Sequence, residues 1–154
     1  MAPCSPAGEP DLGEWRDGVG KRDAEDRLRE AFARDGFPAT ALRLPMVLGP
    51  RDPYRRLAVY LHRVLDGGPL LLPEGADAPA RHVYVGAVSR AVAGLLGNDA
   101  TFGEAYNLCQ DDVLPVASLI PMLVSLAGGR NELVPVRDED LAAHGLERSK
   151  VSPF

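Results

Sequence analysis

Short apolar runs alternate with amphipathic helical patterns along the chain, and this alternation constrains the fold more than any other feature of the sequence. The apolar runs span residues 39–50, 69–73, 81–85, 105–109 and 132–136. Apolar residues at helical spacing predict helices over 21–34, from 53 to about 65, over 87–96, over 116–127 and from 138 onward. Alternating strands and helices are typical of α/β proteins. The sequence therefore predicts an α/β fold.

Glycines and prolines predict where several of these elements begin and end. Gly36 is expected to stop the first helix, and Gly67 and Gly68 are expected to close the second. The run 39–50 is expected to form one buried strand that ends near Pro45. Asp52 is expected to cap a helix whose first residue is Pro53, because proline suits the first helical position.

The chain divides into three segments of different character. Residues 1–18 hold prolines and glycines without apolar periodicity, which predicts a loop or a ragged N-terminus. Residues 19–147 carry the alternating pattern, and residues 148–154 are expected to form a frayed tail. Pro121 lies inside the predicted helix 116–127 and is expected to kink that helix or delay its start.

Composition and charge argue against several classes of protein. The 154 residues have a net charge of −5 and no basic cluster, which disfavours a nucleic-acid surface. No apolar run approaches the ~20 residues that span a bilayer, and the first ten residues lack the layout of a signal peptide. Cys4 and Cys109 form neither a metal-binding spacing nor a disulfide framework. We expect a cytoplasmic protein with reduced thiols, no metal site and no membrane partner.

A lysine that directly follows a glycine, in the stretch Trp15 to Arg22, raises two alternatives for its chemistry. A phosphate-binding P-loop needs glycine five residues before its Gly-Lys pair and serine or threonine directly after it. Those positions hold Trp15 and Arg22, and no apolar strand precedes them. The sequence therefore disfavours the P-loop and leaves the second alternative, a lysine that tunes a nearby acid/base group.

Four segments support that alternative because they occur in a recognisable order. They are GVGKRDAEDRL, TALRLPMVLGPRD, RHVYVGAVSRAVAGLL and AYNLCQDD. Together they resemble the C-terminal half of extended short-chain dehydrogenases, the NAD-dependent epimerase/dehydratase family, over about residues 15–136. The resemblance implies the C-terminal part of a Rossmann-like doubly wound fold with a small substrate-binding subdomain. Because the sequence has no glycine-rich turn after a strand, we expect the N-terminal dinucleotide-binding half to be absent.

The resemblance implies a role for Lys21. In that family a Tyr-x-x-x-Lys motif carries the reaction: the lysine lowers the pKa of the tyrosine and hydrogen-bonds the nicotinamide ribose. Lys21 matches the lysine, as a catalytic and cofactor-binding residue, whereas Asp17 stands at the catalytic tyrosine position. An aspartate held ionised by a neighbouring ammonium cannot donate a proton near neutral pH. The alternative is that Asp17 pairs with Lys21 or caps the helix.

Other positions are assigned by the same resemblance. Pro45, Met46 and Val47 correspond to the family segment whose backbone lies against the nicotinamide; the alternative is a buried strand end with a proline turn.

Arginines are the implied substrate-binding residues. Arg51 and Arg55, with Arg56, lie where the family places substrate-facing groups, and they suit an anionic group such as a nucleotide-sugar phosphate. A solvated helix start is the alternative for these three. Arg81 corresponds to a family arginine that contacts the same phosphate.

The function implied by the resemblance is hydride transfer between NAD or NADP and a sugar or other alcohol or carbonyl substrate. We expect the chain to be the substrate-binding half of such an enzyme, truncated and with little activity alone. Two alternatives remain: a non-catalytic binding or scaffolding module, and a subunit completed by a partner chain that supplies the dinucleotide-binding half. A homodimer is also compatible with the sequence.

Overall fold

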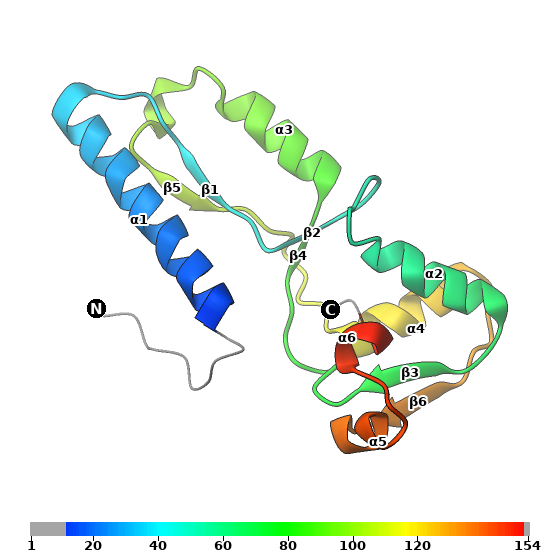
Figure 1. The fold of residues 1–154 in the computed structure, drawn as a ribbon. Helices are drawn as coiled ribbons and strands as arrows, with labels where there is room; N and C mark the ends of the chain where they lie inside the picture. Colours follow the sequence, from blue (N-terminus) through cyan, green and yellow to red (C-terminus); the bar gives the residue numbers. More distant parts are fainter. Residues whose placement is uncertain (1–11, 153–154) are drawn as a thin grey trace. The chain divides into compact units, whose positions relative to one another are not determined.

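The computed structural model of the chain describes residues 12–152 and divides into two compact units. The first unit contains the described residues up to 43 together with 90–107, and the second contains residues 44–89 and 108–152. Each unit combines helices with parallel strand pairs (Figure 1). The predicted α/β fold is therefore confirmed.

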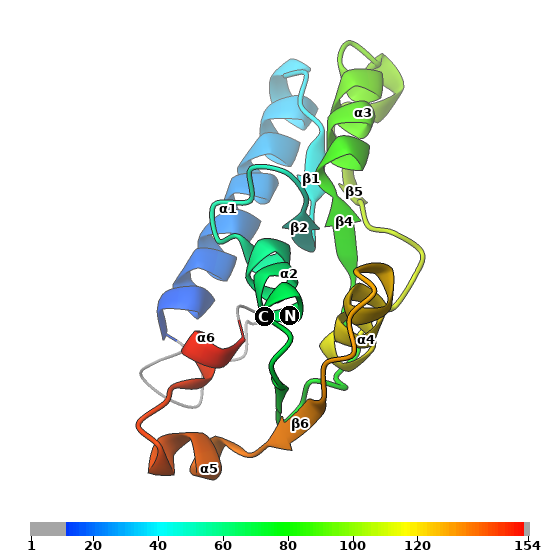
Figure 2. The same cartoon turned by 90° about the vertical axis from the view of Figure 1, so that its right-hand side faces the viewer.

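The first unit is built around one parallel pair of strands. Helix α1 (Leu12–Asp35) leads to strand β1 (Ala41–Arg43), which pairs with β5 (Ala105–Asn107) so that Ala41 lies opposite Ala105. The unit also contains the end of helix α3 (Val85–Leu95) and the 3₁₀ turn η2 (Asp99–Thr101). Two views of the ribbon show β1 and β5 between α1 and the end of α3 (Figures 1 and 2).

Helix α1 begins earlier than the sequence predicts. The structure places residues 12–18 inside the helix, so the predicted loop is wrong for these residues, and residues 1–11, including Cys4, lie outside the described part of the chain. Two glycines in this first stretch, Gly13 and Gly18, each cost about 1 kcal/mol of helix propensity relative to alanine. The helix nevertheless contains an ion pair one turn apart, between Asp17 and Lys21, which stabilises its first half.

The end of α1 follows the prediction. The helix stops at Asp35, and Gly36 adopts a left-handed backbone with φ 68°, which only glycine adopts without strain. The Gly36 N–H donates a hydrogen bond to the carbonyl oxygen of Phe32 at 2.8 Å, so a carbonyl at the helix end is satisfied.

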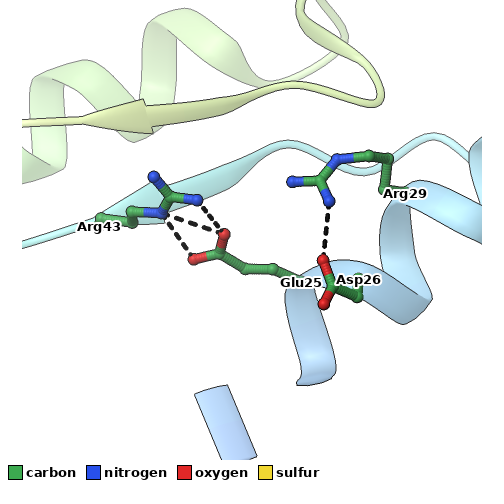
Figure 3. A network of polar contacts seen from close by, with 4 residues as sticks. All are labelled: Glu25, Asp26, Arg29 and Arg43. Atoms are coloured by element: carbon green, nitrogen blue, oxygen red, sulfur yellow. Dashed lines mark hydrogen bonds and ion pairs between the residues drawn. The ribbon is translucent and has the colours of Figure 1, made fainter. Parts of the chain in front are cut away.

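An ion pair attaches α1 to β1. The Arg43 guanidinium donates from Nε and Nη2 to both carboxylate oxygens of Glu25, with distances of 2.6 to 3.0 Å (Figure 3). This two-point geometry is more specific than a single charge contact. Asp26 and Arg29, beside it on the helix, form a second pair at 2.8 Å.

The second unit holds two more parallel strand pairs. Its bounds are β2 Met46–Leu48, α2 Arg56–Asp66, β3 Leu70–Pro73, β4 His82–Tyr84, the start of α3, α4 Val116–Leu126, β6 Leu133–Val136, α5 Asp138–Ala143 and α6 Arg148–Val151. Strand β2 pairs with β4, and β3 pairs with β6. Helices α2 and α4 pack against each other, and α6 contacts β3.

The core of the second unit lies where α2, α4 and β3 meet. Tyr60, Val64, Leu70 and Ile120 form a buried cluster in which Tyr60 and Ile120 have no exposed surface. Around it pack the partly buried residues Leu72, Val116, Leu123, Val124 and Leu133. These positions recur at helical spacing on α2 and α4, so the apolar periodicity of the sequence identified the buried faces in part. Leu65 and Leu126, at the ends of the same apolar patterns, are 72% and 78% exposed.

Two predicted elements differ from the structure near Pro45. The run 39–50 is not one strand but two: β1 pairs with β5, whereas β2 pairs with β4. Pro45 lies between them and has no N–H with which to continue a strand ladder. Helix α2 begins at Arg56 rather than at Pro53, although Gly67 closes it in a left-handed conformation as predicted.

Helices α4 and α6 bear on two further predictions. Helix α4 begins at Val116 and contains Pro121, so its start is not delayed, and the kink at Pro121 stays a prediction. The expected frayed tail is wrong for residues 148–152, because α6 forms there and Val151 and Ser152 are both buried. Residues 153–154 lie outside the described part of the chain.

Candidate functional site

The pairing of β2 with β4 brings two of the sequence-predicted segments together in the second unit. Met46 lies opposite His82 and Val47 lies opposite Val83 in the parallel register. Arg81 directly precedes β4, so it lies next to the strand pair that carries Met46. Pairing of distant segments thus places a residue predicted to contact a cofactor near one predicted to bind a phosphate.

A cavity of about 210 Å³ in the second unit contains this juxtaposition. We call it the Arg81 cavity. The connection 73–80 forms part of its wall. The rest of the lining consists of Met46, Arg81, His82, Val116, Arg148 and Ser152. The lining includes two arginines and no aspartate or glutamate. Its walls are otherwise mainly apolar, so the cavity suits a small ligand that carries both an apolar ring and a negative charge.

Backbone carbonyls hold the Arg81 side chain in place. Its Nη1 donates to the carbonyl oxygens of Gln110 at 3.1 Å and Asp111 at 2.8 Å, in the segment that follows β5. The buried His82 next to it donates from Nε2 to the carbonyl oxygen of Leu114 at 3.0 Å. Both contacts link the start of β4 to the chain that leads into α4. The Arg81 side chain therefore lines the cavity while its Nη1 atom is held by two backbone carbonyl oxygens.

Arg148 is a site residue that the sequence reasoning missed. It lies on α6, which is anchored to α2: the Tyr60 hydroxyl donates to Ser152 Oγ at 2.9 Å, and the Arg63 guanidinium donates to the Val151 carbonyl oxygen. Burial is the main reason that the pKa of Tyr60 is raised, so this hydroxyl stays protonated as a donor. The sequence signal was weak, because four helical residues are too few for a periodic pattern.

The loop between β2 and α2 forms a second, smaller site. A cavity of about 190 Å³ is lined there by Val47, Arg51, Tyr54, Arg56 and Val85, among others. Arg51 (φ 68°) and Arg55 (φ 52°) both adopt left-handed backbone conformations, which are uncommon for residues other than glycine. Arg55 exposes its side chain to solvent and lines neither this cavity nor the Arg81 cavity.

Asp52 organises this loop. Its carboxylate accepts hydrogen bonds from the backbone N–H groups of Tyr54 at 3.0 Å and Arg56 at 2.9 Å, and it pairs with the Arg56 guanidinium at 3.0 Å. Burial by itself would raise the pKa of the Asp52 carboxyl, but these hydrogen bonds and the Arg56 charge together lower the pKa below its usual value. The predicted helix cap at Asp52 is wrong, because the residue before the helix is Arg55. Asp52 instead binds the turn before the helix and the N–H of the first helical residue, Arg56.

Asp17 and Lys21 form an ion pair on α1, in the first unit. Lys21 Nζ lies 2.6 Å from Asp17 Oδ2, and the two side chains are 75% and 65% exposed. The hydrogen bond from Lys21 to Asp17, with the charge of Asp17, raises the pKa of the lysine. The predicted ion pair is therefore present. Asp17 does not cap the helix, because α1 begins five residues earlier. The catalytic and ribose-binding roles of Lys21 stay predictions.

A larger cavity, of about 450 Å³, lies in the first unit and has a different character. It is lined by Leu42 of β1, Val92 and Leu95 of α3, and Phe102, with no charged side chain in its wall. None of the predicted site residues contributes to it. Because it offers no positively charged side chain to an anion, it is a poorer candidate than the Arg81 cavity for a phosphate-bearing ligand.

The fit of a dinucleotide cofactor depends on its phosphate-binding turn. Rossmann-like folds hold the pyrophosphate at a glycine-rich turn between a strand and a helix N-terminus. Within residues 12–152, the connection from β2 to α2 contains one glycine, Gly49, and two prolines. Pro45 lies outside both cavities of the second unit, while Met46 and Val47 line one each. The described residues therefore do not form a complete dinucleotide site.

Metal-binding and membrane-spanning features are also lacking in the described part of the chain. No group of three or more histidine, cysteine, aspartate or glutamate side chains between residues 12 and 152 is arranged to hold a metal ion. No described helix has the length and apolar character needed to cross a bilayer. Cys109 carries a free thiol.

Comparison with solved structures gives several matches, whereas no protein-family model and no curated protein matches the chain. UDP-glucose 4-epimerase from Thermotoga maritima, solved with UDP-glucose, is 25% identical with a TM-score of 0.65; the match covers 87% of this chain and 41% of that one. The dTDP-glucose 4,6-dehydratase from Bacillus anthracis, solved with NAD, is 18% identical with a TM-score of 0.68, covering 90% and 42%.

A third match is the UDP-glucose 4-epimerase from Thermus thermophilus, solved with NAD, at 25% identity and a TM-score of 0.61, covering 84% of this chain and 47% of that one. The chain thus spans less than half the length of each of these three structures. Its mixed α/β fold with parallel strand pairs resembles part of the Rossmann-like fold of sugar-nucleotide epimerases and dehydratases.

Proposed function

We propose that the Arg81 cavity binds a sugar nucleotide, and that the chain is the substrate-binding part of an NAD(P)-dependent epimerase, dehydratase or reductase. The observation that carries this proposal is one cavity, within the second unit, that combines Met46 and two arginines without any carboxylate. The fold likeness to enzymes solved with UDP-glucose or NAD supports the ligand class. In this proposal the described residues correspond to the C-terminal half of such an enzyme.

The size of the cavity limits how much of the ligand it holds. Sites for drug-sized ligands typically enclose roughly 300–1,000 Å³. At about 210 Å³, the Arg81 cavity accommodates part of a sugar nucleotide, such as one ring and the phosphate next to it. The remainder of the ligand, with NAD or NADP, is expected to contact other residues, supplied by another segment or by a partner chain.

A second candidate is a binding module without catalysis, and the pair on α1 favours it. A tyrosine hydroxyl at position 17 is what the resemblance requires, and the structure has there an aspartate whose carboxylate pairs with Lys21 Nζ at 2.6 Å. The two candidates agree on ligand binding and differ on turnover.

Asp17→Tyr, in a chain joined to a dinucleotide-binding half, is expected to restore NAD(P)-dependent turnover if only the tyrosine was lost. Lys21→Met should then abolish that turnover. No gain with Asp17→Tyr would favour the binding module.

Calorimetric titration with UDP-glucose and dTDP-glucose tests the proposed ligand class. We expect saturable binding of at least one of them, weakened tenfold or more by Arg81→Met, because a hydrogen bond to a charged group contributes about 1.5–3 kcal/mol. Arg130→Met removes an exposed arginine that is absent from the cavity lining and serves as the charge-matched control. The proposal fails if neither sugar nucleotide binds, or if the two variants bind equally.

A further inference from the structure

We propose that Arg148, on α6, is a second anion-binding residue of the Arg81 cavity, and that Arg81 and Arg148 together hold a diphosphate group. This inference deepens the proposed function, since it concerns the same cavity. It starts from a residue that neither the motifs of the sequence nor the resemblance singled out. Both arginines line the cavity, and no acidic side chain in the lining neutralises them.

Arg148 lies beside a glycine turn. Gly75 has a left-handed φ of 77°, and a Cβ built on it would lie 3.5 Å from Arg148 Nη2. The guanidinium therefore lies against the turn that follows β3, in the connection that forms the cavity wall. A residue other than glycine would be strained at this φ. Glycine at position 75 is therefore compatible with the turn that lies beside the guanidinium.

Arg148 keeps donor capacity for a ligand. Its nearest acidic partner is Asp138, with 3.5 Å between Nη1 and Oδ2 and with both side chains largely exposed. Charge-assisted N–H···O bonds are typically about 2.7–2.9 Å long, so this contact is a weak one. A guanidinium has five N–H donors in a planar fork, and a single long contact uses little of that capacity.

The anchoring of α6 limits the entropy lost when a ligand binds. Val151 is 5% exposed and Ser152 is 4% exposed, and the contacts from Tyr60 and Arg63 tie this segment to α2. A guanidinium on a fixed backbone loses less conformational freedom on binding than one on a mobile tail. The short helix therefore acts as part of the binding site.

The chemistry of the two groups identifies the ligand group. Arginine forms two parallel hydrogen bonds to phosphate oxygens, which lysine does not. Arg81 has one nitrogen committed to the carbonyls of Gln110 and Asp111, which orients the rest of its guanidinium. Two such groups in one small cavity suit two adjacent phosphates better than one carboxylate. The predicted group is the diphosphate that links the nucleoside and the sugar.

Inorganic pyrophosphate is the probe, because it carries the diphosphate without base or sugar. The full chain is titrated with it while the arginine Nε–H signals are followed by ¹H–¹⁵N NMR. We expect saturable binding that shifts the signals of Arg81 and Arg148. Arg148→Gln is expected to weaken binding at least tenfold, Arg148→Lys less, and Arg130→Gln not at all. Asp138→Asn removes the competing carboxylate and is expected to leave binding unchanged or to tighten it.

Two results would overturn the inference: no saturation with pyrophosphate, or equal affinities for the Arg148→Gln and Arg130→Gln variants. Circular dichroism and urea unfolding of each variant check that α6 and the core remain folded, and Arg148→Lys keeps the test valid if the glutamine variant does not fold. Failure here is distinguishable from failure of the proposed function. If UDP-glucose binds and Arg148→Gln does not weaken that binding, the proposed function is supported and the role of Arg148 is refuted. If pyrophosphate binds through both arginines but no sugar nucleotide binds, the diphosphate site is supported and the proposed function is refuted.

Discussion

Individual side chains explain why the loop before α2 has a defined shape. Asp52 is 8% exposed and Arg56 is 18% exposed, so their ion pair is shielded from solvent more than any other pair in the described structure. Arg56 also lies over the ring of Tyr54, with its guanidinium carbon 4.3 Å from the ring centre. These contacts offset the cost of the left-handed backbone at Arg51 and Arg55.

Removal of the Asp52 side chain is expected to destabilise the second unit. Asp52→Ala leaves the N–H groups of Tyr54 and Arg56 without their acceptor, and the loss of a comparable side-chain acceptor at a helix start costs about 0.5–2 kcal/mol. Urea unfolding at neutral pH measures the change. Asp66→Ala, at the end of α2, is the control and is expected to change stability by less than about 0.5 kcal/mol. Equal effects of the two substitutions would refute the assigned role of Asp52.

For individual residues, the sequence predicted a local contact but not the grouping of residues around the Arg81 cavity. The i,i+4 spacing of Asp17 and Lys21 correctly predicted an ion pair, because one helical turn separates the two residues. The placement of Arg81 beside Met46 depends on β2 pairing with β4 across 36 residues of chain, as 46 and 82 lie opposite each other. Local spacing does not encode such pairing, and Arg148 was missed for the same reason.

In the first unit, an ion pair contributes to the attachment of helix α1 to strand β1. Helix α1 has a mostly exposed surface and no fully buried residue among those described, so its attachment depends on few apolar contacts. The Glu25–Arg43 ion pair is therefore a larger share of what holds α1 to β1. The hydrogen bond from Arg43 is the main cause of the lowered pKa of the Glu25 carboxyl, and the Arg43 and Arg29 charges add to it.

The lowered pKa of Glu25 predicts a pH dependence of stability. In the unfolded chain a glutamate titrates near pH ~4.3, and in the folded chain it titrates lower, so folding releases a proton between these values. The contribution of Glu25 is fully present above the unfolded pKa and is lost as pH falls through the folded pKa. The stability difference between the unaltered protein and Glu25→Gln is therefore expected to shrink as pH falls from neutral to below 4.

Urea unfolding at several pH values measures this difference. Glu30→Gln, on the same helix, is the control, because Glu30 forms no ion pair among the described residues. A stability difference for Glu25→Gln that stays constant with pH, or one that the control reproduces, would contradict the role of the ion pair.

Element prediction succeeded where apolar periodicity and turn residues agreed. The ends of α1 and α2 at Gly36 and Gly67 follow from the left-handed backbone that glycine allows. Prediction failed where neighbouring strands belong to different pairs: β1 and β2 are separated by only two residues, and the sequence shows one apolar run. It also failed at the start of α1, where the glycines at 13 and 18 predicted a loop but the structure has a helix.

At the scale of the whole molecule, each unit has its own parallel strand pairing and its own cavities. The Arg81 cavity lies in the second unit, and the larger cavity without a charged side chain lies in the first. The likeness to solved epimerases and dehydratases covers most of this chain but less than half of theirs. Ligand binding by the second unit is therefore the part of the account that the described residues support directly.

The most direct test is an NMR titration of the full chain, in which UDP-glucose is added and backbone amide shifts are followed. The account predicts shifts that saturate and that concentrate at residues 46, 73–82, 116 and 148–152, around the Arg81 cavity. Residues 92–102, around the uncharged cavity, are expected to change little. Shifts confined to the first unit, or no saturable shift at all, would contradict the claim that the Arg81 cavity is a sugar-nucleotide site.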